Sequence, residues 1–217
     1  MKIQITPKQN VFFCSDPHYH HKSLVRGTSN WVDKSPCRDF DTLKEHDDTL
    51  IDNINKTVRE NDILFCLGDW AFGRFQDSVQ MAIEARNRIN CKNIYFCFGN
   101  HDTKLRKEKE ILNKMFIHYS DYMEVYISEY TSEQGVKPYK QFITMSHYSI
   151  RSWNRMRHGS WNLFGHSHNS LPDYIVKGNV QRSMDVGFDC HPEFRPFSYQ
   201  EIKEIMDKRR IFTEDHH

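Results

Sequence analysis

The stretch NLFGHSHNS, residues 162–170, carries an apolar run into a glycine and then places His166 and His168 on either side of a single serine. In an extended strand, residues two apart point to the same side, so this pattern would aim both imidazoles at one target. Two converging neutral imidazoles suit a metal ion. Polar residues are also common where a strand meets solvent, so the stretch alone leaves a metal site and a plain strand end both open.

Four other apolar runs end in residues that ligate metals or transfer protons. The four are FFCSDPH with Asp16 and His18, LFCLGD with Asp69, YFCFGNHD with Asn100, His101 and Asp102, and FITMSH with His147. In open α/β sheets, functional sites gather beyond the carboxyl ends of the strands. Glycine at such an end lets the backbone approach a ligand closely. Five such endings in order along one chain predict one shared site.

Strand and helix patterns of hydrophobicity alternate along the chain, which predicts an α/β fold. No linker or shift of composition divides residues 1–217, so we expect a single domain. Thr42 with Glu45, and Ser198 with Glu201, are typical helix starts. The expected helices cover residues from 42 to 58, 75–86, 102–116 and 198–210. The expected strands cover 11–16, 63–67, 94–98, the residues before 165 and those around 184–186, with a hairpin across 122–146 around a Gly/Pro turn.

The composition excludes several classes of protein. The chain is 38% hydrophobic and 27% charged, with a formal net charge of +1, so nothing global indicates a nucleic-acid or membrane surface. No apolar run approaches the length of a membrane-spanning helix. The first residues lack a signal-peptide core, so we expect a cytoplasmic protein, and no obligate protein partner is evident. His216 and His217 could be the remainder of a purification tag.

The cysteines are expected to be reduced. Six are present without a CxxC motif, and Cys14, Cys66 and Cys97 lie inside apolar runs. Buried free thiols that fill the core are therefore a simpler interpretation than disulfides or metal ligands.

The five strand ends together resemble the motif set of the calcineurin-like metallophosphoesterases. The matching pieces, in order, are Asp16-x-His18, Gly68-Asp69, Gly99-Asn100-His101-Asp102, His147 and Gly165-His166-x-His168. The stretches SDPHYHHKSL, GDW and SHYSIRSW are similar to small bacterial and phage members that lack accessory domains. The resemblance implies a β-sandwich of two mixed sheets flanked by helices, with two divalent metal ions at the strand ends.

The resemblance also implies a role for each residue of the set. One metal would be held by Asp16, His18, Asp69 and His168, and the other by Asp69, Asn100, His147 and His166. His101 would be the general acid, and Asp102 would orient or acidify it. On the alternative interpretation, Asp16, Asp69 and Asn100 are turn or N-cap residues, and Asp102 caps the helix that follows.

These residue types suit phosphoester hydrolysis. The Asp69 carboxylate has two oxygens and can bridge ions ~3.5–4 Å apart. Imidazole, carboxylate and amide ligands without thiolate favour Mn²⁺, with Fe, Zn²⁺ or Ni²⁺ as alternatives, over a structural zinc site. Two cations acidify a shared water, and the resulting hydroxide would attack phosphorus in line. His101, which binds neither ion, would protonate the leaving oxygen.

The segment HYSIRSWNRMRHGSW, residues 147–161, is expected to contact the substrate. Arginine binds phosphate and aromatic faces stack on bases, which favours a small phosphoester, a nucleotide or a short nucleic acid. The candidate contacts are His21, Tyr148, Arg151, Trp153 and His158. The alternative is that the tryptophans belong to the core, the arginines to a solvated surface and His21 to a solvated loop.

The same motifs are compatible with more than one function. A phosphodiester or nucleotide-type substrate is favoured, while a phosphomonoesterase or a dinucleoside polyphosphate hydrolase would use the same metals. A non-catalytic scaffold that binds protein would be expected to lack metal ligands, whereas every expected ligand and His101 are present in this chain.

Overall fold

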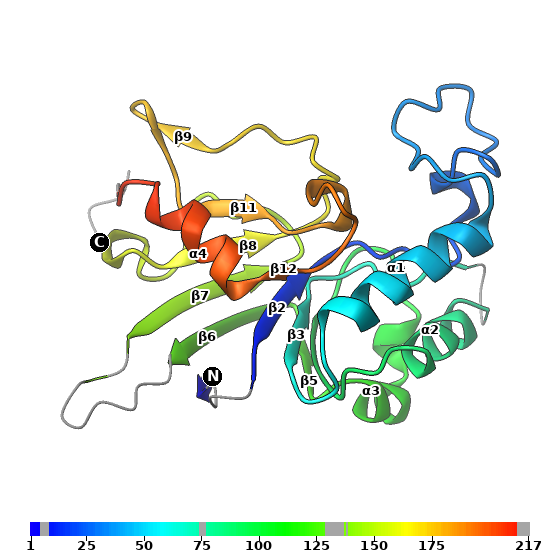
Figure 1. Ribbon diagram of the computed structural model, residues 1–217, viewed down its shortest axis with the longest axis horizontal. Helices are drawn as coiled ribbons and strands as arrows, with labels where there is room; N and C mark the ends of the chain where they lie inside the picture. Colours follow the sequence, from blue (N-terminus) through cyan, green and yellow to red (C-terminus); the bar gives the residue numbers. More distant parts are fainter. Residues whose placement is uncertain (5–8, 74–76, 129–136, 138, 212–217) are drawn as a thin grey trace.

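The computed structural model describes residues 1–4, 9–73, 77–128, 137 and 139–211 (Figure 1). Two five-stranded sheets form its centre, in the orders β12-β2-β3-β4-β5 and β1-β6-β7-β8-β11. Both sheets are mixed. In the first, only the β12–β2 pair is antiparallel, and in the second, only the β6–β7 pair is antiparallel. The expected α/β fold with two mixed sheets and flanking helices is confirmed.

The strands are short. The first sheet contains β2 (Val11–Cys14), β3 (Ile63–Cys66), β4 (Asn93–Cys97), β5 (His118–Ser120) and β12 (Phe197–Ser198). The second contains β1 (Lys2–Gln4), β6 (Tyr122–Ser128), β7 (Lys140–Ser146), β8 (Trp161–Phe164) and β11 (Ser183–Asp185). A separate hairpin joins β9 (Ile175–Val176) to β10 (Asn179–Val180).

Helices flank the sandwich. Within the described ranges, the α-helices are α1 (Leu43–Thr57), α2 (Asp77–Asn87), α3 (Lys109–Met115) and α4 (Tyr199–Asp207). Short 3₁₀ turns are η1 (Lys22–Leu24), η2 (Leu105–Lys107), η3 (Met156–His158) and η4 (Phe188–Cys190). Figure 1 shows α1, α2 and α3 grouped beside the first sheet, with α4 on the side of the second.

Alternation along the central strands builds two cores. On β2, Phe12 and Cys14 pack with the residues of α1, α2 and α3, while Val11 and Phe13 pack between the sheets and against α4. This follows from the two-residue period of a strand. Because both faces are covered, β2 and β3 are buried along their whole length. Burial on both faces explains why the sequences of β2 and β3 are apolar at every position rather than at alternate ones.

The two helix starts predicted from capping residues are confirmed at α1 and α4, whereas other helix boundaries differ from the sequence prediction. The Ser198 hydroxyl and the Glu201 carboxylate form a complete capping box at α4. At α1 the Thr42 hydroxyl accepts the Glu45 N–H, but the Glu45 carboxylate accepts the N–H of Asp41, one residue before the cap. The expected 198–210 helix ends at Asp207, and the expected 102–116 helix is divided into η2 and α3.

Several elements lie outside the sequence predictions. Strands β1, β5, β9, β10 and β12 are only two or three residues long. Tertiary pairing, rather than a local pattern, defines strands of this length. The expected turn between β6 and β7 falls largely outside the described residues, as do Phe75, His216 and His217.

The cysteines and the helix lengths can be compared with the sequence predictions. All six cysteines are free, and Cys14, Cys66 and Cys97 are buried, as predicted. Among the helices of the described residues, none combines the length and the apolar character needed to cross a membrane.

Candidate metal centre

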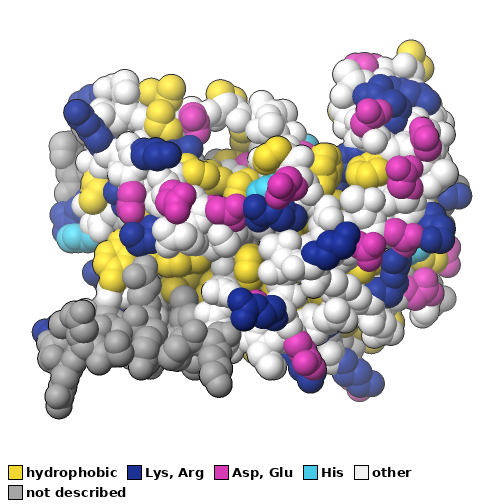
Figure 2. Space-filling model, in the orientation of Figure 1, with side chains coloured by type: hydrophobic (Ala, Val, Ile, Leu, Met, Phe, Trp, Pro, Cys, Tyr) yellow, Lys and Arg dark blue, Asp and Glu magenta, His cyan; other side chains and the backbone are white. Residues whose placement is uncertain are grey.

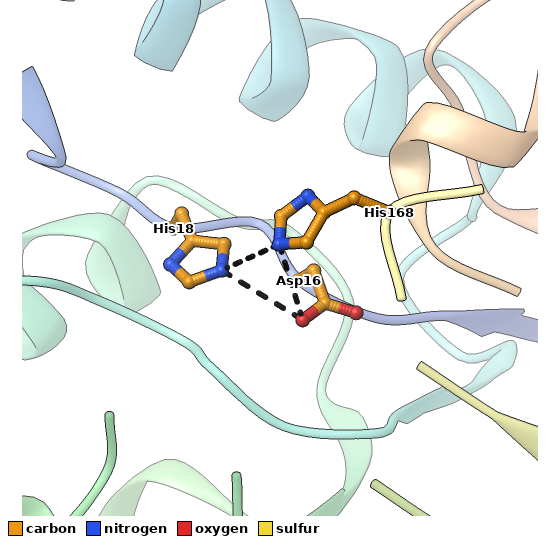
Figure 3. A group of neighbouring side chains, drawn as sticks. All are labelled: Asp16, His18 and His168. Atoms are coloured by element: carbon orange, nitrogen blue, oxygen red, sulfur yellow. Dashed lines mark hydrogen bonds and ion pairs between the residues drawn. The ribbon is translucent and has the colours of Figure 1, made fainter. Parts of the chain in front are cut away.

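The ends of β2 and β8 bring together a first triad, defined as Asp16, His18 and His168. Figure 3 shows the three side chains pointing toward one another. The Nε2 atom of His18 lies 3.2 Å from the Nε2 atom of His168 and 3.7 Å from Oδ1 of Asp16. Oδ1 of Asp16 is buried and has no hydrogen-bond partner among the described residues. A buried carboxylate oxygen beside two imidazoles fits a cation.

A second triad, defined as Asp69, His147 and His166, lies beyond β3, β7 and β8. The Nε2 atom of His147 is 3.4 Å from Oδ2 of Asp69 and 3.0 Å from Oδ1 of Asn100. The Nδ1 atom of His147 is 2.8 Å from the Leu67 carbonyl oxygen. A hydrogen bond from Nδ1 to that carbonyl leaves Nε2 free to bind a metal, which is the usual arrangement for a ligating histidine.

The Asp69 carboxylate belongs to the second triad and also faces His18 of the first triad. Its Oδ2 atom is 3.5 Å from Nε2 of His18 and 3.4 Å from Nε2 of His147. Its Oδ1 atom accepts the backbone N–H of His101. Burial favours the neutral form of Asp69, but the neighbouring His147 and His101 outweigh burial and lower its pKa. An ionised carboxylate in this position is suited to bridging two cations.

Burial shifts the pKa values of two first-triad residues, Asp16 and His18, toward their neutral forms. Burial raises the pKa of Asp16 to about 6, against the opposing charges of His168 and His147. Burial, followed by the nearby Arg38 charge, holds the pKa of His18 well below its usual range. A neutral imidazole is the form that ligates a metal. The nitrogen and oxygen donors of both triads, with no thiolate, fit Mn²⁺, Fe or Zn²⁺.

The candidate ligands do not lie on extended strands. The backbone φ angles of Asp16, His18, Asp69, His166 and His168 are 56°, 49°, 55°, 69° and 46°, all in the left-handed region. The expectation that strand alternation aims His166 and His168 at one target is wrong. Strand β8 ends at Phe164, and the turn that follows sends the two rings to different triads. Strained residues of this kind are frequent at functional sites.

Glycine at the strand ends makes room for the ligands. A Cβ atom on Gly165 would lie 1.9 Å from the Ser15 hydroxyl oxygen and 2.5 Å from Oδ2 of Asp16. That Oδ2 atom accepts the backbone N–H of His166. Gly68 has a φ of +107° and a Cβ there would lie 2.6 Å from Nδ1 of His147. The sequence-based expectation of close backbone approach therefore has a physical basis at both positions.

His101 lies at the edge of the centre. Its Nε2 atom is 3.9 Å from Oδ2 of Asp69, and its side chain is 35% exposed. Together with His18 and Asp69 it also forms a group that could hold a metal ion. A general acid and a metal ligand are both compatible with this position. The acid role of His101 stays a prediction.

Asp102 is buried beneath the centre. Its carboxylate accepts the backbone N–H groups of Gly99, Asp69 and Trp70. Burial, then the charge of Asp69, raises its pKa to about 7, although these three N–H groups oppose the shift. Among the described contacts, none joins its carboxylate to the His101 ring. Asp102 thus ties the loop after β3 to the loop after β4, and its expected role beside His101 stays a prediction.

Two residues near the first triad were missed by the sequence analysis. The Nδ1 atom of His168 lies 2.7 Å from the Asp189 carboxylate, and Arg38 donates to both oxygens of that carboxylate. Arg38 lies in PCRDF and Asp189 in GFDCH, where no local pattern distinguishes either residue from an ordinary surface charge.

A cleft of about 940 Å³ opens over the metal centre. Its lining includes His21, Trp31 and Phe72, together with these residues of the centre: His18, Asp69, Asn100, His101, His166 and His168. The His21 ring stacks on Phe72 at a centroid distance of 3.9 Å and meets Trp31 edge-on at 6.4 Å. Figure 2 shows the surface hollowed beside the loop that follows η1. Trp31 and Phe72 are aromatic lining that the sequence analysis also missed, although a tryptophan in the polar stretch GTSNWVD is an available signal.

Of the expected substrate contacts, His21 and Tyr148 lie at the metal centre, whereas the others lie in the core or elsewhere on the surface. His21 lines the cleft, and the exposed Tyr148 ring lies 4.7 Å from the His166 ring. Trp153 is buried and its indole N–H donates to the Ser160 carbonyl, which favours the core interpretation.

Two further expected contacts lie away from the cleft lining. Arg151 lines a different cavity, of about 520 Å³. His158 is exposed on η3, where its Nε2 accepts from the neighbouring Arg157. The chain after His147 turns away from the two triads, so Arg151, Trp153 and His158 do not line the cleft.

The sequence model of the family described as calcineurin-like phosphoesterase matches residues 10–173. The chain belongs to this family. The match spans both triads, from the strand before Asp16 to the turn after His168. The resemblance carried by the strand-end motifs is confirmed.

Two other proteins are similar to this member of the calcineurin-like phosphoesterases. The uncharacterized protein MJ1445 of Methanocaldococcus jannaschii is 24% identical over 208 residues, which are 94% of each chain. The crystal structure of AQ665 from Aquifex aeolicus, a protein of unknown function, matches with a TM-score of 0.57 at 17% identity. That match covers 91% of this chain and 100% of the other. The fold is therefore similar to that of AQ665 over nearly the whole chain.

Proposed function

We propose that this metal-dependent phosphoesterase holds two divalent cations, with Mn²⁺ favoured, and hydrolyses a phosphodiester or a nucleotide-type phosphoester. The observation that carries the proposal is the position of Asp69, whose Oδ2 atom lies within 3.5 Å of a histidine from each triad. Asp16, His18 and His168 would hold one ion, and Asn100, His147 and His166 the other, with Asp69 shared. Bound cations would supply Lewis-acid stabilisation of the phosphoryl oxygens and acidify water.

The chain's own residues supply positioning and proton transfer. The second-triad histidine His147 is held by the Leu67 carbonyl, and His168 by Asp189, so each presents Nε2 to the centre. His101 has an exposed edge beside Asp69 and would donate a proton to the leaving oxygen. His21 lies next to His101, with ring centroids 5.9 Å apart, and is the next candidate for the acid.

The aromatic lining of the cleft supports a nucleotide-type substrate. Of the four tryptophans, Trp70, Trp153 and Trp161 are buried, whereas Trp31 is 40% exposed and lines the metal cleft. An exposed indole beside a phosphate-binding centre suits stacking on a nucleobase. The nucleotide preference therefore rests on Trp31 in place of Arg151 and Trp153. A monoester or a dinucleoside polyphosphate remains the alternative substrate.

We also propose a cytoplasmic location, a single domain over residues 1–217 and action without an obligate protein partner. Buried free thiols suit a reducing compartment. A location in an oxidising compartment, shown by fractionation, would contradict the first of these proposals.

Metal analysis combined with two nitrophenyl esters tests the proposed function. The purified chain is stripped with a chelator, and metal content is measured before and after Mn²⁺ is restored. Rates are then measured on bis(p-nitrophenyl) phosphate and p-nitrophenyl phosphate. We expect two ions per chain, activity only with metal and a preference for the diester. A chain that binds two ions and cleaves neither ester would contradict the hydrolase assignment, and a monoester preference would favour the alternative substrate.

A further inference from the structure

Arg38 is a buried cation that contacts the scaffold of only one triad. It lies between η1 and α1, and its side chain is 1% exposed. Its guanidinium donates to the backbone carbonyls of Asp16 and Pro17, at 2.6 and 3.1 Å. These two carbonyls belong to the segment in which both first-triad residues, Asp16 and His18, have left-handed φ angles. Arg38 therefore stabilises this backbone conformation directly.

The same guanidinium reaches the third member of the first triad through Asp189. Arg38 Nε donates to Oδ1 of Asp189 at 2.9 Å, and its NH2 group donates to Oδ2 at 2.6 Å. That Oδ2 atom is 2.7 Å from Nδ1 of His168. A carboxylate that accepts from Nδ1 fixes the tautomer and the ring orientation, so that Nε2 faces the centre. Arg38 in turn fixes the carboxylate.

No comparable link from Arg38 leads to the second triad. The described hydrogen bonds of its guanidinium end at Asp16, Pro17, Asp189 and the buried ring of His46. The second triad is held by other groups: Nδ1 of His147 faces the Leu67 carbonyl, and the exposed His166 ring packs on Tyr148. The two metal positions thus have separate side-chain supports, apart from the shared Asp69.

We propose that Arg38 is a positioning residue for the metal held by Asp16, His18 and His168, and that the other metal position forms without it. The inference rests on the two-metal centre proposed above. Arginine is required because its planar fork donates in five directions at once, whereas a lysine ammonium has three donors on a flexible stem. The charge of Asp189 offsets the guanidinium charge, so the pair stabilises ligand geometry without adding net charge beside a cation.

The test measures metal binding rather than activity. Metal content by elemental analysis and Mn²⁺ affinity by calorimetry are compared in the wild type and Arg38→Lys. Loss of such an outer-sphere support typically weakens metal affinity about 10–100-fold. We expect two ions in the wild type and one tightly bound ion in Arg38→Lys. Adding His166→Ala to Arg38→Lys should then weaken the ion that remains.

A matched control separates this effect from the loss of any buried arginine. Arg86 donates to the carbonyls of Met115, Ile89 and Cys91 behind α2 and does not contact the centre. Arg86→Lys should keep both ions, whatever its thermal stability. Asp189→Asn, which keeps the shape of the side chain and removes its charge, should reproduce the Arg38→Lys metal content if Arg38→Lys itself does not fold.

The outcomes distinguish this inference from the proposed function. Two ions with unchanged affinities in Arg38→Lys and Asp189→Asn overturn the inference and leave the two-metal centre intact. Equal weakening of both ions also overturns it, because the support would not be selective. A wild-type chain that binds fewer than two ions contradicts the two-metal centre itself, and the inference fails with it.

Discussion

The Nε2 atoms of His18 and His168 face each other at 3.2 Å, and Nδ1 of His168 lies 2.7 Å from Asp189. When that Nδ1 carries the proton, the Nε2 atom of His168 has a lone pair pointing at the His18 ring. A cation between the rings would use the lone pairs of both histidines. The first triad is therefore expected to gain stability from a bound metal.

Metal removal should lower the melting temperature. Binding to the native state stabilises by about 2.7 kcal/mol at a ligand concentration of 100 times Kd. For a chain of this size, each kcal/mol corresponds to roughly 2–4 °C. Thermal unfolding with Mn²⁺ and with excess chelator should therefore differ by about 5–10 °C. Identical melting curves would count against a metal-binding native state.

Replacement of Asp69 by asparagine should reduce the occupancy of both metal positions and activity together. The variant keeps the shape of the side chain but removes the charge that faces His18 and His147. Asp62→Asn is the matched control, because the Asp62 carboxylate is equally buried and accepts the backbone N–H groups of Asn10 and Arg59. If Asp69→Asn still binds two ions per chain and turns over normally, the bridging role is wrong.

Replacement of His101 by alanine should separate proton transfer from metal binding. A general acid supplies about 10²–10⁴-fold in rate and matters most for a poor leaving group. We expect the variant to keep both ions and to lose far more activity on an alkyl or ribose ester than on a nitrophenyl ester. His118→Ala, on the exposed edge of β5, is the control. A lost ion, or equal slowing of both esters, would make His101 a ligand or a transition-state contact.

Replacement of Trp31 by alanine should weaken nucleobase binding selectively. Adenosine 5′-monophosphate and ribose 5-phosphate share the phosphate and the sugar, so their inhibition constants isolate the contribution of the base. Stacking on an aromatic side chain is worth about 1–3 kcal/mol, so the variant should lose about fivefold or more on the nucleotide alone. Arg151→Ala, outside the cleft lining, should leave the ratio unchanged. Equal inhibition by the two compounds in the wild type would contradict a base-stacking role.

The ligand types and their convergence could be predicted because each follows a buried parallel strand. Strands β2, β3 and β4 are adjacent and parallel, as are β7 and β8. The carboxyl ends of the strands in each set therefore lie at the same edge of their sheet. Side-chain direction could not be predicted, because it depends on left-handed turns at residues such as His166 and His168. These turns are stabilised by contacts from distant loops, which a local pattern does not contain.

Arg38 and Asp189 were missed because no local pattern records their pairing. Arg38 and Asp189 are 151 residues apart and become partners only through the fold. Conversely, Trp153 is a residue type expected of a substrate contact, yet its ring is buried and its indole N–H donates to the Ser160 carbonyl. Residue type therefore indicated a possible chemistry, whereas the path of the chain after β7 determined whether that chemistry reaches the centre.

The ligand loops are joined to one another by main-chain hydrogen bonds. The N–H groups of Asp16 and His18 donate to the carbonyls of Gly68 and Asp69, and the N–H of Gly165 donates to the His147 carbonyl. A substitution in one loop can therefore displace a ligand carried by another, so the effects of paired substitutions will not add. Exchanging one ligand for another residue type would therefore require a matching change in the loop that is hydrogen-bonded to it.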